Sequence, residues 1–323
     1  MQRRHFITLT AASAATLAMP ALAQSAYPNK PIKLIVPYAA GGFPDTVARI
    51  FSKHLGERFG QGVVIDNKPG ANGVVAAQAL ASSPADGYTF LVTDGSMFSI
   101  NPLIYKQLAY DRNKDFMPVA LLARAPLFLA VHPRIVANSF AEFVALAKSK
   151  PGDLTYGSSG IGSTHHLCTE AMKAALGIDI RHIPFKGTAQ SIPALIGGQV
   201  DAVFSALPSL AGFVKSNQVK LLAVNSAKRY SQTPELPAIS ETIPGFDFAP
   251  TVGMLAATGT PAATIARMSA EIAAVSKLAE VIRTFNNAGI EVGGAGPADY
   301  AKAIQGENER MVGAVKIAQL KPE

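Results

Sequence analysis

The chain has 323 residues, of which 49% are hydrophobic and 16% are charged, and its formal net charge is +7. This content is ample for a hydrophobic core, and the length favours two domains over one. The positive charge is mild and dispersed, with no run of Lys or Arg, which argues against nucleic-acid binding. The single cysteine, Cys168, excludes an intramolecular disulfide and is expected to be a buried, inert thiol.

Residues 1–23 have the order of a secretory signal peptide. Arg3 and Arg4 give a positive start, an apolar stretch follows from Phe6 to Met19, and Ala21-Leu22-Ala23 forms a small-residue cleavage site. The apolar stretch is too short to span a bilayer. We therefore predict export and cleavage after Ala23, by the Sec route or, because two arginines open the signal, by the twin-arginine route. A buried N-terminal helix is the alternative.

Short β-branched runs alternate with amphipathic helical stretches, which is the pattern of an α/β fold with parallel strands. In the first half, strands are predicted at 32–37, 63–66 and 88–93, and helices at 46–58 and 72–80. A long strand at 121–131 is broken at Arg124-Ala125-Pro126, as expected where a chain crosses between lobes. Further strands are predicted at 154–158, 180–184, 200–204, 220–225 and 252–256, and further helices at 164–176, up to 196, and from near Pro261 and Pro297.

The same unit of strand, glycine-rich loop and capped helix opens each half of the chain. This repetition predicts two similar α/β lobes that face each other across a cleft and are joined by crossing strands. We expect residues 24–125 and 246–323 to form the first lobe and residues 126–245 to form the second. Asp45 is the expected N-cap of the first helix, and Gly60 and Gly177 are the expected ends of two helices.

The two glycine-rich loops carry the predicted chemistry. Residues 37–45 read PYAAGGFPD and residues 157–164 read GSSGIGST, and each segment joins the end of a strand to the start of a helix. Glycines let backbone N–H groups converge, and a helix start adds about half a positive charge there. Because neither loop contains Lys or Arg, neutral donors would hold an anion, which suits a carboxylate that must be released. Both loops could instead be tight structural turns.

Enzyme motifs are incomplete in this sequence. The segment 160–165 lacks the third glycine of a dinucleotide fingerprint, and the segment 157–160 does not have the spacing of a nucleophile elbow. His165 and His166 are adjacent and so point apart on a helix, and Glu170, the nearest carboxylate, does not complete a site with them, so we expect no metal. We predict no catalysis and no cofactor. An exported hydrolase that uses a serine of the second loop with His165 or His166 is the alternative.

Six ordered motifs resemble those of one receptor family. They are PYAAGG at 37–42 with Asp45, DNKPGA at 66–71 with Gly73, ADGYT at 85–89, Gly162 with His166-Leu167, FKG at 185–187, and GGQVD at 197–201. From Tyr27 to the C-terminal helices, the chain resembles the substrate-binding proteins of tripartite tricarboxylate transporters, also called Bug receptors. The resemblance implies a class II periplasmic-binding-protein fold, a periplasmic monomer without catalysis, and a small organic carboxylate delivered to membrane permease subunits. A sensor for a two-component system is the alternative role.

The resemblance also implies which residues hold the ligand. The carboxylate would be bound by Ala40 to Asp45 and by Ser158 to Thr164, often through ordered water, with Asp201 and Ser205 near the cleft. The complete set of predicted ligand-binding residues is Tyr38, Ala40, Gly41, Gly42, Phe43, Asp45, Ser96, Phe98, Ser158, Ser159, Gly162, Ser163, Thr164, His166, Phe185, Asp201 and Ser205.

Two departures from the family pattern bear on the choice of ligand. Many members have a tryptophan two residues before the glycine of the return strand, where this chain has Thr251. The third residue of the Gly-Gly loop is bulky Phe43. Because Phe43 and Phe98 could wall an apolar ligand body, we expect an aromatic, terephthalate-like acid or a long aliphatic dicarboxylate in preference to citrate. Ordinary packing of these aromatic rings is the alternative.

Overall fold

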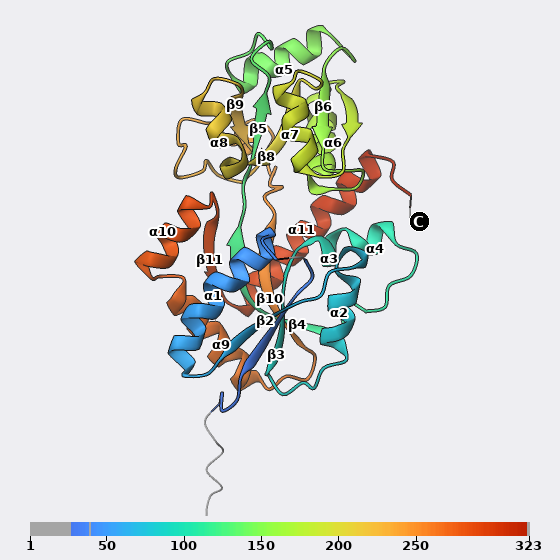
Figure 1. The fold of residues 1–323 in the computed structure, drawn as a ribbon. Helices are drawn as coiled ribbons and strands as arrows, with labels where there is room; N and C mark the ends of the chain where they lie inside the picture. Colours follow the sequence, from blue (N-terminus) through green and yellow to red (C-terminus); the bar gives the residue numbers. More distant parts are fainter. Residues whose placement is uncertain (1–26, 39, 322–323) are drawn as a thin grey trace, which may run out of the picture.

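The structure is a computed structural model that describes residues 27–38 and 40–321. These residues form two α/β lobes, stacked one above the other and joined by crossing strands (Figure 1). The predicted α/β class and the two-lobed architecture are confirmed. The predicted signal peptide, residues 1–23, lies outside the described residues. In the described part, no helix is long and apolar enough to cross a membrane.

The first lobe is organised by a six-stranded sheet in the order β11-β4-β10-β3-β1-β2. β1 is parallel to β2 and β3, whereas β10 is antiparallel to β3 and β4, and β11 is antiparallel to β4. The elements of this lobe are β1 (Ile32–Val36), α1 (Phe43–Phe59), β2 (Val63–Asn67), η1 (Ala71–Gly73), α2 (Val74–Ala81), β3 (Thr89–Asp94), α3 (Ser96–Ser99), α4 (Asn101–Ile104), β4 (Phe116–Arg124), β10 (Thr251–Ala257), α9 (Ala262–Val275), α10 (Ala279–Asn287) and β11 (Glu291–Ala295).

The second lobe is built on a five-stranded sheet in the order β7-β6-β8-β5-β9. β6 is parallel to β7 and β8, and β5 is antiparallel to β8 and β9. Its elements are β5 (Leu127–Val131), α5 (Phe140–Ser149), β6 (Thr155–Ser158), α6 (Thr164–Leu176), β7 (Arg181–Pro184), α7 (Thr188–Ile196), β8 (Ala202–Ala206), α8 (Leu207–Lys215), β9 (Lys220–Val224) and η2 (Ile239–Glu241).

Side-chain alternation along β1 explains how its sheet is covered on both faces. Leu34 is fully buried in the cluster that includes Phe51 of α1, whereas Ile35 is buried in the cluster that includes Leu80 of α2. Successive residues of a strand point to opposite faces, so a nearly continuous apolar run suits a strand buried on both sides. The run of apolar residues in β1 therefore places a helix on each side of the sheet.

The helix boundaries follow from local chemistry. α1 and α6 end at Gly60 and Gly177, whose φ values of 63° and 62° are left-handed, and both predicted ends are confirmed. Ser163 is the N-cap of α6 and accepts from the backbone N–H of His166 at 3.3 Å. The prediction that Asp45 caps α1 is wrong, because the helix begins three residues earlier than predicted, at Phe43, and Gly42 is its N-cap.

The chain changes sheet twice. β4 ends at Arg124 in the first lobe and β5 begins at Leu127 in the second, so the predicted break in the long strand is the first crossing. The return lies between β9, which ends at Val224, and β10, which begins at Thr251. The predicted lobe boundaries, 125/126 and 245/246, both fall inside these crossings.

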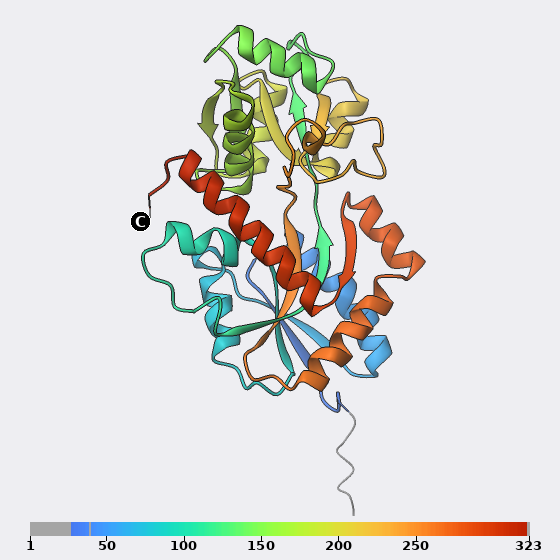
Figure 2. The same cartoon turned by 180° about the vertical axis from the view of Figure 1, so that it is seen from behind.

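One more helix, α11 (Pro297–Ile317), contributes to both lobes and runs diagonally between them (Figure 2). Tyr300, near its start, is buried in a core cluster of the first lobe. Met311, Ala314 and Val315, near its end, are buried in the core of the second lobe. The predicted division gave residues 246–323 to the first lobe alone, whereas the structure packs the last turns of this helix on the second lobe.

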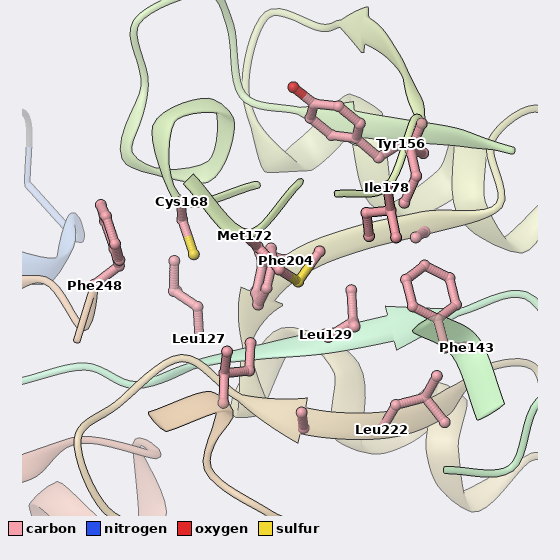
Figure 3. Close-up of a cluster of buried hydrophobic side chains, with 14 of the residues drawn as sticks. Leu127, Leu129, Phe143, Tyr156, Cys168, Met172, Ile178, Phe204, Leu222 and Phe248 are labelled. Carbon is pink, nitrogen blue, oxygen red and sulfur yellow. The ribbon is translucent and has the colours of Figure 1, made fainter. Parts of the chain in front are cut away.

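The core of the second lobe contains the only cysteine of the chain (Figure 3). Cys168 of α6 is fully buried, in the same cluster as Leu129, Phe204 and Phe248. Burial in this apolar cluster raises the pKa of the Cys168 thiol far above its usual value. A protonated thiol is a poor nucleophile, so the expectation of a buried, inert cysteine is confirmed.

Candidate functional site

A cavity of about 470 Å³ lies between the two lobes. That volume is in the range of small-molecule sites. The first lobe contributes the loop before α1, the end of β3, the loop between α10 and β11, and α11. The second lobe contributes the starts of α6 and α7, the end of β8 and the start of α8. The lining residues are Gly41, Phe43, Thr46, Asp94, Gly95, Ala125, Leu127, Thr164, His165, Thr188, Ser205, Ala206, Pro208, Ser209, Pro250, Ala288, Gly289, Ile290 and Glu307.

The start of α1 forms one end of the site. Gly41, Phe43 and Thr46 line the cavity there. Gly41 has a φ of 88°, a left-handed conformation that glycine adopts without strain. An α-helix leaves its first N–H groups without intrahelical partners, and its dipole favours negative charge at this end. The first glycine-rich loop therefore presents a helix start, with no Lys or Arg, to the cavity.

Asp45 stabilises this loop through a hydrogen bond to its backbone. Its buried carboxylate accepts from the backbone N–H of Gly41 at 2.8 Å, from Arg49 at 2.7 and 3.0 Å, and from Asn67 at 2.9 Å. Burial disfavours the charged form, but the bonds from Arg49, Asn67 and Gly41 outweigh it and lower the pKa of Asp45 to about 2. Asp45 is thus ionised, is outside the cavity lining, and positions Gly41.

The second glycine-rich loop supplies the opposite wall, at the start of α6. Ser158 Oγ lies 2.6 Å from His182 Nε2, Ser159 Oγ lies 2.8 Å from His165 Nδ1, and Ser163 Oγ donates to the Gly160 carbonyl at 2.7 Å. The three serine hydroxyls of the loop are therefore engaged within the second lobe. The lining residues from this loop and the start of α6 are Thr164 and His165.

His165 is uncharged at neutral pH, because burial lowers its pKa to about 4. The other polar side chains that the second lobe adds to the lining are also neutral: Thr164, Thr188, Ser205 and Ser209. This wall can donate and accept hydrogen bonds without a fixed charge. From the sequence, His165 is a candidate only for a metal ligand or a catalytic base, so its place in the lining is not predicted.

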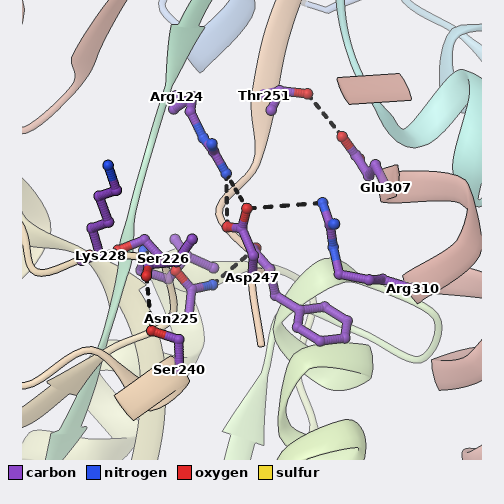
Figure 4. A network of polar contacts seen from close by, with 12 residues as sticks. Arg124, Asn225, Ser226, Lys228, Ser240, Asp247, Thr251, Glu307 and Arg310 are labelled. Carbon is purple, nitrogen blue, oxygen red and sulfur yellow. Dashed lines mark hydrogen bonds and ion pairs between the residues drawn. The ribbon is translucent and has the colours of Figure 1, made fainter. Parts of the chain in front are cut away.

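Two acidic side chains line the first-lobe wall, and no sequence motif predicts either of them. Asp94 ends β3 and accepts from Tyr38 Oη at 2.8 Å. Glu307 of α11 accepts from Ser99 Oγ at 3.1 Å. It also accepts from Thr251 Oγ1 at 2.8 Å (Figure 4). Burial raises the pKa of Glu307 to about 7, and the nearby charge of Asp94 acts in the same direction.

Four of the predicted ligand-binding residues line the cavity: Gly41, Phe43, Thr164 and Ser205. Ala40 and Gly42 flank Gly41, and Gly162 and Ser163 shape the second loop, but they do not belong to the lining. Tyr38 acts on the lining through its bond to Asp94. Ser96 begins α3, and its side chain lies outside the described part.

Three predicted residues lie outside the cavity lining because their side chains pack in a core or stack on another ring. Phe98 is buried in the first-lobe core, with its ring edge-to-face against Phe116 at 6.0 Å, so it cannot wall a ligand. His166 is buried and stacks on His182 with ring centroids 4.1 Å apart. Phe185 packs against the second-lobe core.

Asp201 also lies away from the cavity, contrary to expectation. It directly precedes β8, at the end of the strand opposite to Ser205. Its carboxylate accepts from Arg134 at 2.7 Å and from the backbone and hydroxyl of Thr155, both at 2.9 Å. These bonds tie β8 to β6 and to the segment after β5, which is a structural task.

The serine–histidine pairs of the second loop are not arranged as a hydrolytic triad. Glu170, whose charge acts on both His166 and His182, accepts hydrogen bonds from Tyr156 at 2.6 Å and from Lys173 at 2.8 Å. A triad needs a carboxylate that orients the histidine beside the serine.

Within residues 27–38 and 40–321, no group of three or more His, Cys, Asp or Glu side chains is placed to hold a metal ion.

Comparison with known proteins identifies the family. Residues 47–320 match the sequence model of the tripartite tricarboxylate transporter family receptor. The chain belongs to this family. A protein of Bordetella pertussis is 33% identical to this receptor over 96% of the chain and 97% of its own length, and BugT from the same species is 30% identical over 90% of each. The predicted family is therefore confirmed, and it is a family of solute-binding receptors.

Two solved structures share the fold of this receptor. An R. palustris protein solved with adipate is 34% identical, with a TM-score of 0.77 over 92% of this chain and 100% of its own. MatC from Rhodopseudomonas palustris, solved with malate, is 28% identical, with a TM-score of 0.71 over 90% of this chain and 100% of its own. Both similarities extend over both lobes and the cleft between them.

Proposed function

We propose that this receptor captures a small organic carboxylate in the periplasm and delivers it to the membrane permease of a tripartite tricarboxylate transporter. One observation carries the proposal: α1 and α6 both begin at the same cavity, from opposite lobes, through loops without Lys or Arg. Helix starts and neutral donors bind a carboxylate while still allowing its release. The adipate and malate in two related structures support a carboxylate ligand, and the signal-like residues 1–23 support export.

The location of the ligand between the lobes also accounts for how binding would be signalled to a permease. A ligand that contacts both lobes stabilises the closed arrangement, because only that arrangement supplies both sets of contacts. The permease would then bind the closed arrangement of the two lobes, which indicates that the cleft is occupied.

The sequence favours an aromatic acid or a long aliphatic dicarboxylate as the ligand, and the structure supports the aromatic acid less well than the sequence does. Phe98 lies in the core, so Phe43 is the one predicted aromatic residue that lines the cavity. A single ring can pack on an aliphatic chain as well as on another ring. We therefore propose an aliphatic or aromatic carboxylate small enough for a cavity of about 470 Å³.

A thermal-shift screen against aliphatic and aromatic carboxylates, followed by calorimetry, tests the carboxylate proposal. A ligand at 100 times its dissociation constant adds about 2.7 kcal/mol to the free energy of unfolding. We expect carboxylates to raise the melting temperature and their methyl esters to have no effect. A screen in which only amines or sugars raise the melting temperature would reject the proposal, and turnover of esters or amides would favour the hydrolase alternative.

A matched pair of variants tests the role of the α1 start. Gly41 and Gly60 lie at opposite ends of α1, both have left-handed φ values, and a Cβ at either position would meet no atom within 4 Å. Alanine at either site should therefore cost about 1 kcal/mol of stability. We expect Gly41→Ala to weaken carboxylate binding at least tenfold and Gly60→Ala to leave it unchanged. Equal affinities of the two variants would remove the α1 start from the binding site.

A further inference from the structure

His165 is the second residue of α6, and its ring is held by a serine of the second glycine-rich loop. Ser159 Oγ lies 2.8 Å from His165 Nδ1. The two nitrogens of an imidazole ring stand on different sides of the ring, so a hydrogen bond at Nδ1 directs Nε2 away from Ser159. The loop therefore fixes the orientation of the ring and leaves Nε2 for another partner.

The second ring nitrogen of His165 is accessible from the cavity. The side chain is partly exposed and belongs to the cavity lining. Among the described residues, none forms a hydrogen bond with Nε2, and Nε2 is not one of the polar atoms that are sealed from solvent without a partner. A nitrogen that is unpaired and not sealed, on a residue that lines a cavity, can bond to whatever occupies that cavity.

The bond to Ser159 also decides what Nε2 can offer. Burial lowers the pKa of His165 to about 4, so the ring is neutral at neutral pH and carries one N–H and one acceptor nitrogen. The partner of one ring nitrogen sets which nitrogen is protonated. When the Ser159 hydroxyl donates to Nδ1, the proton is on Nε2. The pair then presents an N–H donor to the cavity without a fixed charge.

Ser205 adds a second donor to the same wall. It lies on β8, lines the cavity and is only 1% exposed. Its hydroxyl has no hydrogen-bond partner in the part of the chain that the structure describes, and it too is not sealed from solvent. A buried hydroxyl without a partner is unfavourable, so its place at the cavity is explained by a partner that binds there.

We propose that His165 donates a hydrogen bond from Nε2 to the ligand carboxylate, with Ser205 as a further donor, and that Ser159 is a positioning residue that acts through His165. This inference rests on the proposed function, because it takes the carboxylate from it. It differs from the site expected from the sequence, in which the loop serines bind the ligand themselves and His165 has no part. The second lobe thus contacts the ligand through a histidine that the loop holds in one tautomer.

Two replacements of His165 separate binding from support of the loop. A glutamine amide can place an N–H near the position of Nε2, whereas an asparagine amide reaches only the position of Nδ1 and can still bond to Ser159. Calorimetry uses the acid that binds the unmodified receptor most tightly in a panel that includes adipate, malate and terephthalate. We expect His165→Gln to keep the affinity within about threefold and His165→Asn to lose roughly tenfold or more.

A ring that only supports the loop gives the opposite order. His165→Asn that binds as tightly as His165→Gln, or more tightly, would therefore overturn the proposal. His132→Gln is the matched control, because His132 is in the same lobe, bonds through Nδ1 to the N–H of Arg134 and lies outside the cavity lining. Its affinity should equal that of the unmodified receptor. Circular dichroism confirms that each variant is folded.

Nitrogen NMR of receptor labelled with ¹⁵N-histidine tests the tautomer directly. The signals of His165 are those that disappear in His165→Gln. With the carboxylate bound, we expect Nε2 protonated and shifted by the ligand, and Nδ1 unprotonated. Ser159→Ala should increase the fraction of the other tautomer and weaken binding about fivefold. A liganded receptor in which His165 is protonated at Nδ1 and not at Nε2 would overturn the proposal.

Failure of this inference can be told from failure of the proposed function. If no carboxylate of the panel binds the unmodified receptor, the proposed function fails, and the role of His165 fails with it. If a carboxylate binds but His165→Asn and His165→Gln do not differ, the role of His165 alone fails.

Discussion

Replacement of Glu307 by Gln should change how the stability of the receptor depends on pH. Burial raises the pKa of Glu307 from its ordinary value of 4.5 to about 7. Between these values the folded receptor holds a proton that the unfolded chain releases. The contribution of Glu307 to the free energy of unfolding is therefore fully present below pH 4.5 and is lost as the pH rises through 7. The interval between the two pKa values corresponds to about 3 kcal/mol. A glutamine has no such proton and should lose nothing.

The assay is urea unfolding at several pH values between 4.5 and 8.5. The difference in unfolding free energy between Glu307→Gln and the unmodified receptor should shift by about 3 kcal/mol in favour of the variant as the pH rises. Other titrating groups are shared by the two proteins, so they cancel in this difference. The exposed Glu309→Gln control should give a flat difference. A flat difference for Glu307→Gln as well would refute the reasoning that burial governs this carboxyl group.

Three further changes test packing around the cleft. Gly289→Ala places a Cβ 2.6 Å from Pro208 of the other lobe, so it should hold the lobes apart and weaken ligand binding about tenfold in calorimetry. Gly60→Ala is the control and should leave binding unchanged, because Gly60 has a similar φ and no atom lies within 4 Å of its added Cβ. Asp45→Ala removes a buried carboxylate with several donors and should lower the unfolding free energy by about 2 kcal/mol in urea. Phe285→Ala empties a fully buried position and should cost about 3 to 5 kcal/mol; a loss below 1 kcal/mol would contradict the packing.

Much of the fold could be predicted because its signals are local. Gly60 and Gly177 end helices since left-handed backbone is easy for glycine, and the break at 124–126 marks a crossing. α5 was missed, although Ser139 accepts from the N–H of Glu142 and Glu142 in turn from the N–H of Asn138, a capping pattern readable in the sequence. The start of β4 at Phe116 was also missed, because polar residues interrupt the preceding segment.

The site could be predicted only where its residues belong to one loop. Gly41 and Thr164 were expected because a glycine-rich loop and the helix that follows it are contiguous in sequence. Asp94 and Glu307 are 213 residues apart, and a glutamate in the middle of a helix ordinarily faces water. Glu307 faces the cavity because α11 passes between the lobes, which depends on the packing of both cores. Phe98 was misassigned for the same reason, since its burial depends on Phe116.

The helix that joins the two cores also has a consequence for the order in which the protein matures. Tyr300 completes a core cluster of the first lobe, and Met311, Ala314 and Val315 complete the core of the second. Both cores therefore lack wall residues until residues 297–317 have left the ribosome. A chain cut before residue 297 would leave two unfinished cores instead of one finished lobe. In this receptor, both lobes depend on α11 to complete their cores.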